Sequence, residues 1–439
     1  MPGLNGNTSA HLENLSDRTV TNERVKIAVT LLTGGDDPSY VYGLTNSLTS
    51  HGVTIDLIGS DQLDRPEYRG RPDIQFFNLR GSLRSDVSFA TKTLRILRYY
   101  LRLMRYTVSA RPALFHILWN NKFESFDRTA LMLFYRAFGK KTLLTAHNVN
   151  AAKRDLKDTF LNRVTLRVQY RLADHIFVHT DKMKEELEIQ FGVPRGRVTV
   201  IPFGINDAVP KTNLSRAEAK QQLGLRDDER AILFFGRIAP YKGLQYLISA
   251  FQELEKGHNN YRLMIAGRPD KCEEYWARML QEVQEQTRSG RVLLRAEHIP
   301  EGDTEIYFKA ADVLVLPYTD VFQSGVLFLG QSFGLPVIAS RAGSLDEEIV
   351  DGENGFTFKA GDSGDLASSI ERYFASDIYA ELSERRHTIR AKASEQHSWN
   401  AVGQLTLRAY SDLLKVTVGG ESKGGRQPRA SMDGDVSLE

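Results

Sequence analysis

The sequence contains one cysteine, Cys272, among its 439 residues. A single cysteine cannot supply an intramolecular disulfide or a cysteine-based zinc site, so both are excluded. The acidic neighbours Glu273 and Glu274 disfavour a catalytic thiolate, because nearby carboxylates raise the pKa of a thiol. This scarcity of cysteine is typical of proteins from a reducing compartment, and it predicts a cytoplasmic localisation.

Long apolar runs are also absent. No segment approaches the ~20 consecutive apolar residues that a membrane-spanning helix requires, and residues 1–22 lack the apolar segment of a signal peptide. Neither sign of charge dominates, since Lys and Arg total 57, Asp and Glu total 55, and the net charge is +2. This balance argues against nucleic acid as a partner, because nucleic-acid-binding proteins present a basic field.

The length of the chain and its apolar fraction of 41% suit two domains with ordinary cores. Residues 1–22 and 417–439 are polar or rich in small residues, so we expect both terminal tails to be disordered. Between the tails, short apolar runs alternate with longer amphipathic stretches. This alternation predicts an α/β protein with doubly wound sheets.

The first predicted βαβ unit contains a glycine-rich turn. Val25–Leu32 has the pattern of a buried strand, Gly34 and Gly35 follow it, and Tyr40–Ser50 has the pattern of a helix. Two glycines let a ligand approach the backbone closely, and a plain tight turn is the alternative. Because the three-glycine dinucleotide fingerprint is missing, binding of a nicotinamide cofactor is disfavoured.

His147 directly follows a strand predicted at residues 141–146. Ligands bind at the carboxyl ends of strands in an open α/β sheet, so His147 is a candidate site residue. A loop histidine with a structural hydrogen bond is the alternative. His116, His175 and His179 lie in or beside strand-like runs, and we interpret them as structural. No pair of histidines has metal-ligand spacing beside a carboxylate-bearing helix, so a zinc site is not predicted.

The second half of the chain repeats the alternation of strands and helices. We expect strands at 231–235, 261–266, 292–294, 313–316 and 337–339, and helices at 244–256, 273–288, 304–310, 327–333 and 345–350. The loop between the first strand and helix, Gly236–Gly243, carries Arg237 and Lys242. Two cations beside the positive end of a helix favour a phosphate or diphosphate as ligand. An ordinary loop with two solvated basic residues is the alternative.

A second motif follows about ninety residues later. Gln323–Leu329 begins as a Ser-Gly turn and continues as a helix. The segment Gly334–Ser340 follows, with a glycine that ends the helix and then a buried strand. Ser324 and Gly325 fall where the helix begins, so their backbone amides are placed to bind the far side of the same diphosphate.

Together these motifs resemble the GT4 family (glycosyltransferase group 1) of retaining glycosyltransferases with the GT-B fold. Ile201–Asn206 resembles the interdomain linker of that family, and Glu347–Phe356 resembles the segment after its donor site. The resemblance implies two Rossmann-like domains facing a cleft, with a C-terminal helix that crosses back onto the first domain. The implied boundaries are 23–205 for the acceptor domain, 206–397 for the nucleotide-sugar domain and 398–416 for the crossover helix.

The resemblance also implies a function: transfer of a hexosyl residue from a nucleotide-diphosphate sugar to a saccharide or lipid-linked saccharide, in the synthesis of a surface polysaccharide or glycoconjugate. Retention of configuration, no metal and no cofactor are implied as well, with Arg237 and Lys242 stabilising the leaving phosphate in place of a metal. Gly34 and Gly35 would face the donor, and His147 would lie near the transferred sugar. The remaining donor contacts would come from four consecutive residues: Gln323, Ser324, Gly325 and Val326.

The sequence departs from the family at two positions. Val321 and Leu329 stand where most members carry glutamates that contact the sugar and the ribose of the donor. Gln323 and Asp320 are the nearby polar residues, and Asp320 is a candidate for sugar binding. This departure motivates the alternative of an inactive GT-B-like scaffold or regulatory nucleotide-binding protein. A nicotinamide enzyme, an epimerase and a phosphorylase are further alternatives.

Residues 91–106 predict a basic amphipathic helix. Its cations recur every three or four residues on one arc, next to an apolar arc that includes Leu94, Leu97 and Leu101. The cations are Lys92, Arg95, Arg98, Arg102 and Arg105. Such a helix suits the surface of an anionic membrane, and thus a peripheral location on the inner face of the plasma membrane. The alternative is a domain helix with its apolar arc directed inward and its basic arc in solvent.

Overall fold

The first half of the chain forms a parallel sheet of seven strands in the order β3-β2-β1-β4-β5-β6-β7. The computed structural model describes residues 27–34, 37–82, 88–154, 157–205 and 209–415. Both expected terminal tails, and Gly35, therefore lie outside the described residues. The strands are β1 (Ala28–Leu32), β2 (Thr54–Gly59), β3 (Ile74–Asn78), β4 (Leu114–Ile117), β5 (Lys141–Thr145), β6 (His175–Val178) and β7 (Val198–Val200).

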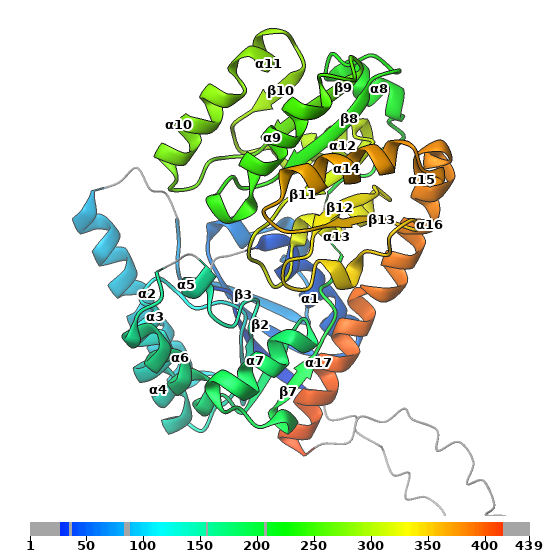
Figure 1. Ribbon diagram of the computed structural model, residues 1–439. Coiled ribbons are helices and arrows are strands. Elements are labelled where there is room, and N and C mark those ends of the chain that lie inside the picture. The colour runs from blue at the N-terminus through cyan, green and yellow to red at the C-terminus, as the bar shows by residue number, and fades with distance from the viewer. Residues whose placement is uncertain (1–26, 35–36, 83–87, 155–156, 206–208, 416–439) are drawn as a thin grey trace, which may run out of the picture.

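The second half forms a parallel sheet of six strands in the order β10-β9-β8-β11-β12-β13. Its strands are β8 (Arg230–Phe235), β9 (Tyr261–Ala266), β10 (Val292–Arg295), β11 (Val313–Leu316), β12 (Val337–Ser340) and β13 (Gly355–Phe358). The central strands are almost wholly buried because helices cover both faces of each sheet, and this explains their continuous apolar sequences. The predicted fold class, two Rossmann-like α/β domains, is confirmed (Figure 1).

Helices connect the strands of both sheets (Figure 1). In the first domain they are α1 (Pro38–Ser50), α2 (Phe89–Ser109), α3 (Glu124–Phe126), α4 (Met132–Ala137), α5 (Ala151–Arg154), α6 (Phe160–Leu172) and α7 (Asp181–Phe191). In the second they are α8 (Arg216–Gln222), α9 (Leu244–Leu254), α10 (Glu273–Glu282), α11 (Gln284–Arg288), α12 (Glu301–Ala310), α13 (Gly325–Ser332), α14 (Ser363–Phe374), α15 (Asp377–Ala380) and α16 (Leu382–Gln396).

Two elements of the second domain differ from the sequence prediction. No strand is predicted at Gly355–Phe358, but this segment forms β13 at the edge of the sheet beside β12. Instead of the helix expected at 345–350, only a single 3-10 turn forms, at Asp346–Glu348. Both segments are short, and the pairing of β13 with β12 is a long-range contact that periodicity does not report.

The C-terminal helix α17 (Trp399–Leu414) packs against α1 of the first domain. The Trp399 ring lies where side chains of Gly43 and Gly204 would otherwise be, and its indole N–H donates to the Ile205 carbonyl at 2.7 Å. Further along, Tyr410 is buried in the core beside β4, and its hydroxyl lies 2.7 Å from His116 Nδ1. The helix therefore anchors the end of the second domain to the first.

Helix α2 is longer than predicted, and only part of its apolar arc faces the core. Tyr100 and Leu103, which widen that arc, are buried together with Tyr99 and Thr107. Leu94, Leu97 and Leu101 are 57%, 52% and 64% exposed. One side of the arc is therefore directed inward, as the domain-helix alternative predicts, and the other side is in solvent.

Candidate active site between the two sheets

A cavity of about 380 Å³ lies between the two domains. The chain order reverses between β1 and β4 in the first sheet and between β8 and β11 in the second. In doubly wound sheets, the loops at the carboxyl ends of such strands form the ligand site. The cavity is lined by the loops after β8 and β11, by the start of α1 and by Trp399 of α17. We call it the donor cavity.

Arg237 and Lys242, the two predicted phosphate ligands, both line the donor cavity. Arg237 is half exposed, and Asp270 holds its guanidinium at 3.1 Å. Lys242 is buried, and its Nζ donates to the Tyr318 hydroxyl at 2.7 Å and lies over the Tyr318 ring. Gly236, directly before Arg237, adopts φ 99°, a backbone conformation that favours glycine. The loop thus presents one half-exposed and one buried positive charge to the same cavity.

Burial lowers the pKa of Lys242 to about 8, and the nearby cations Arg237 and Arg154 add to this effect. At pH 7 the ammonium group is still mostly protonated. A buried ammonium without a carboxylate partner is unfavourable, and an entering phosphate would supply the missing negative charge. This electrostatic arrangement favours an anionic ligand.

The opposite wall of the donor cavity is the N-terminus of α13. Ser324, Gly325 and Val326 line it there, and the Ser324 hydroxyl lies 3.3 Å from the Tyr318 hydroxyl that also binds Lys242. No side chain caps α13, so its first backbone N–H groups are available to an anion. Gln323 Oε1 is buried at this wall and, among the described residues, has no hydrogen-bond partner.

The positions that depart from the family motif lie at the same cavity. Val321 and Leu329 are buried and line it, so an apolar surface occupies part of the wall. Asp320 is exposed and is not among the lining residues. Gln323 is therefore the polar side chain that the structure places beside the two apolar substitutions.

His147 forms a hydrogen-bonded pair with His179, and the distance from His147 Nδ1 to His179 Nε2 is 3.0 Å. His179 Nδ1 lies 3.3 Å from the Ile201 carbonyl, which only accepts, so this nitrogen carries the proton of His179. His179 Nε2 is then the acceptor, and His147 Nδ1 the donor. Burial lowers the pKa of His179 to about 4 and that of His147 well below its usual range, so both rings are neutral.

Because the proton of His147 is on Nδ1, its Nε2 is unprotonated and can accept a hydrogen bond. This atom is buried, and no hydrogen-bond partner for it exists in the described part of the chain. The ring stacks on Trp119 with centroids 4.2 Å apart and planes 5° from parallel. His147 is therefore a rigid, neutral acceptor suited to a hydroxyl group.

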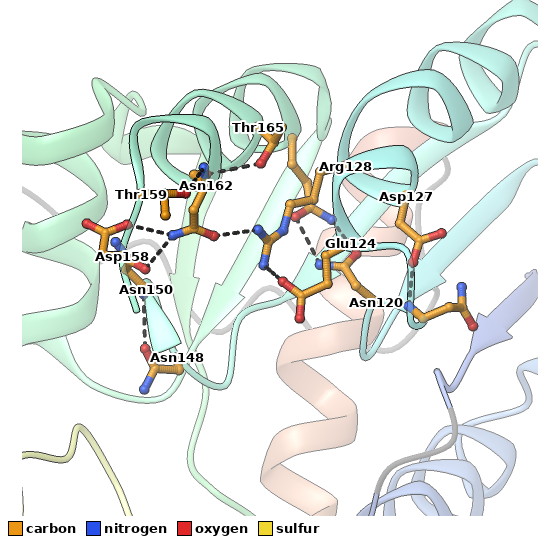
Figure 2. Close-up of polar contacts among 12 residues, drawn as sticks. Asn120, Glu124, Asp127, Arg128, Asn148, Asn150, Asp158, Thr159, Asn162 and Thr165 are labelled. Atoms are coloured by element: carbon orange, nitrogen blue, oxygen red, sulfur yellow. Dashed lines mark hydrogen bonds and ion pairs between the residues drawn. The ribbon is translucent and has the colours of Figure 1, made fainter. Parts of the chain in front are cut away.

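His147 also lines a polar cavity of about 320 Å³ in the first domain. Two of its lining residues belong to a network of hydrogen bonds in which Arg128 lies between Asn162 and Glu124 (Figure 2). Asn162 continues the network to Asn150, at 2.9 Å. Arg154 lines both the polar cavity and the donor cavity, so the two are neighbours. Fixed amides and carboxylates beside a donor site suit a saccharide with many hydroxyl groups.

Sequence reasoning did not identify three residues of this site. Tyr318 holds Lys242, Arg154 lies over the Tyr241 ring at 4.4 Å, and His179 orients His147. Each comes from a segment without a local motif. Only the tertiary structure brings them to the cleft. Gly34, a predicted donor contact, is not among the residues that line the donor cavity, and φ 59° with the close approach of the Trp119 carbonyl requires glycine there.

Comparison with known proteins agrees with this geometry. The sequence model of the family described as glycosyl transferases group 1 matches residues 215–396. The model described as glycosyltransferase family 4 matches residues 38–209. The chain belongs to this family of glycosyltransferases. Together the two matches include both sheets except for β1, and they confirm the resemblance identified from the motifs.

Relatives of this glycosyltransferase family include a D-inositol 3-phosphate glycosyltransferase of Acidothermus cellulolyticus, 28% identical over 55% of this chain and 54% of that protein. The chain thus spans about half the length of the curated relatives it matches. Similar structures include a sucrose-phosphate synthase of Thermosynechococcus elongatus (TM-score 0.69, 20% identity, 89% and 99% of the two chains). An Anabaena protein, HepE, in complex with UDP-glucose is also similar (TM-score 0.67, 16% identity, 88% and 99%).

The described residues contain no group of three or more His, Cys, Asp or Glu side chains arranged to hold a metal ion. Within the same residues, no helix has both the length and the apolar character needed to cross a bilayer.

Proposed function

We propose that the protein transfers a hexosyl residue from a nucleotide-diphosphate sugar to a saccharide or lipid-linked saccharide acceptor. The observation that carries this proposal is the donor cavity, in which Arg237 and Lys242 face the uncapped N-terminus of α13. Two cations and a set of backbone amides around one space suit a diphosphate. The similarity to a protein solved with UDP-glucose supports a nucleotide sugar as donor.

Arg237 and Lys242 stabilise the charge that develops on the leaving diphosphate when the anomeric C–O bond breaks. The electron pair of that bond goes to the phosphate oxygen, and an acceptor hydroxyl oxygen forms the new bond to the anomeric carbon. The hydroxyl proton passes to the leaving phosphate, which lies on the same face of the sugar. Configuration is retained in this step, and neither a metal nor a cofactor takes part.

His147 binds the transferred sugar in this proposal. Its Nε2 accepts a hydrogen bond from a sugar hydroxyl, because His179 fixes the tautomer that leaves Nε2 unprotonated. Gln323 takes the place of the missing carboxylates at the wall near Val321 and Leu329. Asp320 remains a candidate for sugar binding only if the loop after β11 rearranges, since it does not line the cavity.

The exposed face of α2 suits a membrane that carries the acceptor. Leu94, Leu97 and Leu101 form an exposed stripe beside Arg98 and Arg102. Apolar side chains between arginines bind the interface of an anionic bilayer. This surface supports a lipid-linked acceptor and a role in the synthesis of a surface polysaccharide or glycoconjugate.

Calorimetric titration with UDP, GDP and ADP tests the proposal. We expect one nucleotide to bind the wild-type protein and the Arg237→Ala, Lys242→Ala double variant to lose that binding. Hydrolysis or transfer assays with sugars carried on the same nucleotide then identify the sugar. A folded wild-type protein that binds none of the three nucleotides would contradict the proposal.

The alternative, an inactive scaffold that binds nucleotides, is favoured by Val321 and Leu329 alone. It predicts nucleotide binding without turnover of any donor sugar. The buried, unpartnered Gln323 Oε1 and His147 Nε2 oppose it, because a site that binds no sugar would leave both atoms unsatisfied.

A further inference from the structure

The loop after β11 supplies much of one wall of the donor cavity. Residues 317–324 make up this loop, and Tyr318, Val321, Gln323 and Ser324 line the cavity. The loop contains neither a strand nor a helix, so its conformation depends on what it contacts. We call it the donor loop.

Phe322 lies between two residues that line the donor cavity, but its ring packs elsewhere. It is partly buried against the hydrophobic core of the first domain, in the cluster that includes Met183 and Leu187 of α7. Among the described residues, every other side chain of that cluster comes from the first domain. Burial raises the pKa of Glu186 on α7, and Asp320 adds to this rise, so Asp320 also lies near this helix. The donor loop of the second domain is therefore anchored in the first.

The loop after β12, residues 341–348, packs directly on the donor loop. The Ser344 N–H donates to the Phe322 carbonyl at 3.1 Å. Gly343 adopts φ 62°, and a Cβ at this position would lie 1.4 Å from the Val321 carbonyl oxygen. Only glycine permits so close an approach in this conformation. The two loops therefore behave as one packed unit.

Lys182, in the first turn of α7, binds this unit from the first domain. Its Nζ donates to the Gly343 carbonyl at 2.5 Å and lies 2.8 Å from the Glu347 carboxylate and 3.5 Å from that of Asp346. The Lys182 side chain is 45% exposed, so solvent weakens these ion pairs. The apolar contact of Phe322 is expected to contribute the larger part of the attachment.

The attachment matters because of the two positions that depart from the family motif. Val321 and Leu329 offer no hydrogen bond to a donor sugar, which leaves Gln323 as the polar side chain at this wall. Gln323 Oε1 is buried and has no hydrogen-bond partner within the described part of the chain. Its neighbour Phe322 fixes the backbone that carries this amide, so the amide is oriented before a ligand enters.

We propose that Phe322 and Lys182 position the donor loop: by attaching it to α7, they hold its cavity-lining side chains in the arrangement that binds the donor. Neither side chain lines the donor cavity, so both act through the loop. A ligand binds only the fraction of molecules in which the loop has this arrangement, and its apparent Kd rises as that fraction falls. The proposal rests on the proposed function, because it concerns the donor site of that reaction.

Calorimetric titration of the full chain with UDP, GDP and ADP is the first test. For the nucleotide that binds the wild type, Phe322→Ala should raise the Kd on the order of tenfold, because the apolar anchor is lost. Lys182→Met should raise it by a smaller factor, since an exposed ion pair contributes less. Phe322→Leu retains an apolar side chain and should restore most of the affinity.

Two matched controls make the same chemical changes away from the contact between the domains. Phe76→Ala truncates a partly buried phenylalanine of β3 that packs in the first domain. Lys392→Met removes an exposed ion pair with Glu353 inside the second domain. Both controls should leave the Kd of the nucleotide unchanged.

Hydrogen exchange of the same proteins, measured by mass spectrometry, distinguishes positioning of the loop from a general loss of stability. In Phe322→Ala we expect faster exchange in peptides that cover residues 317–324 and 341–348, with unchanged exchange in β8 and β11. Added nucleotide should slow the exchange of these peptides again, because it selects the ordered loop.

Faster exchange throughout Phe322→Ala would show a structural role only and would overturn the inference. Faster exchange of the loops without a change in Kd would also contradict it. An unchanged Kd in Phe322→Ala, with normal binding by the wild type, contradicts this inference alone. A wild-type protein that binds no nucleotide contradicts the proposed function instead.

Discussion

Lys242 is a buried ammonium group whose nearest polar partner is a neutral tyrosine hydroxyl. Burial raises the pKa of Tyr318, so this hydroxyl keeps its proton and does not neutralise Lys242. The pKa of Lys242, about 8 in the free protein, should rise when an anionic phosphate binds beside it. Binding of the nucleotide is therefore linked to protonation of a single side chain.

We expect the affinity for the nucleoside diphosphate to fall as pH rises through about 8. The sign follows because the bound state holds the proton of Lys242 more strongly than the free state does. Calorimetry at a series of pH values measures this change. Lys242→Met should lower the affinity at pH 7 and remove the dependence, whereas Lys256→Met, an exposed control in the same domain, should retain it.

His179 has no direct contact with the proposed donor in our interpretation, and its effect passes through His147. Without an acceptor at this position, His147 Nδ1 loses its partner, and the ring is free to adopt the other tautomer. The buried acceptor at Nε2 would then become a donor. His179 is thus a positioning residue for the proposed contact with the sugar.

The variant His179→Phe should lower kcat for sugar transfer on the order of tenfold, the cost of about one hydrogen bond. The dissociation constant for the nucleoside diphosphate should not change, because His179 lines neither wall of the diphosphate site. His179→Gln, which retains an acceptor, should restore most of the activity. A parallel loss of nucleotide affinity and kcat would indicate a structural role only.

Helix α2 shows how periodicity predicts a helix without predicting its buried face. The sequence places leucines on one arc and arginines on the next, which is the pattern of a helix with its leucines in the core. In the fold, Leu94, Leu97 and Leu101 share the exposed surface with the arginines, because Tyr99, Tyr100 and Leu103 pack in the core of the first domain. An exposed apolar stripe between cations is unusual unless a partner covers it.

We expect the triple variant Leu94→Ser, Leu97→Ser, Leu101→Ser to lose binding to vesicles that contain anionic lipid, measured by co-sedimentation. The melting temperature should change little, since exposed side chains contribute about 0.5 kcal/mol or less to the free energy of unfolding. Leu103→Ala is the opposite control. It should lower the melting temperature by creating a core cavity, without altering the exposed stripe. Unchanged vesicle binding in the triple variant would contradict a membrane role for this face.

The two domains are also joined through helix α17, whose Trp399 lines the donor cavity. The ring packs in a space that depends on the absence of side chains at Gly43 and Gly204. The Phe203 and Phe328 rings, 5.2 Å apart, and the ion pair between Lys182 and Glu347 add contacts between the domains. The position of the cleft therefore depends on contacts that are distant in the sequence.

We expect Gly43→Ala to destabilise the protein, although alanine is the better helix former by about 1 kcal/mol. The new Cβ would lie 2.0 Å from Trp399 Cε2, and the indole is held by its bond to Ile205. Overpacking of this kind costs about 1–3 kcal/mol, so the clash outweighs the propensity. Thermal denaturation measures the effect, and Gly196→Ala, at a glycine with open space around it, is the control. An increase in melting temperature for Gly43→Ala would contradict this packing.

Most of the fold follows from local patterns. Buried parallel strands have continuous apolar sequences because both of their faces are covered. The sequence between Val25 and Ala339 therefore predicts most strands and the two-domain α/β class. The loop with Arg237 and Lys242 and the turn at Ser324 are readable for a similar reason. A strand end followed by a helix start fixes where backbone amides point, whatever the rest of the chain does.

Other features depend on residues far apart in the chain. Tyr318 meets Lys242 and His179 meets His147 only after the sheets form. The exposure of Leu94, Leu97 and Leu101 on α2 also depends on such distant contacts. Periodicity in a sequence shows which side chains share a face of a helix or strand. Packing between elements decides what that face contacts, and it sets the burial and the nearby charges that shift the pKa values of its side chains.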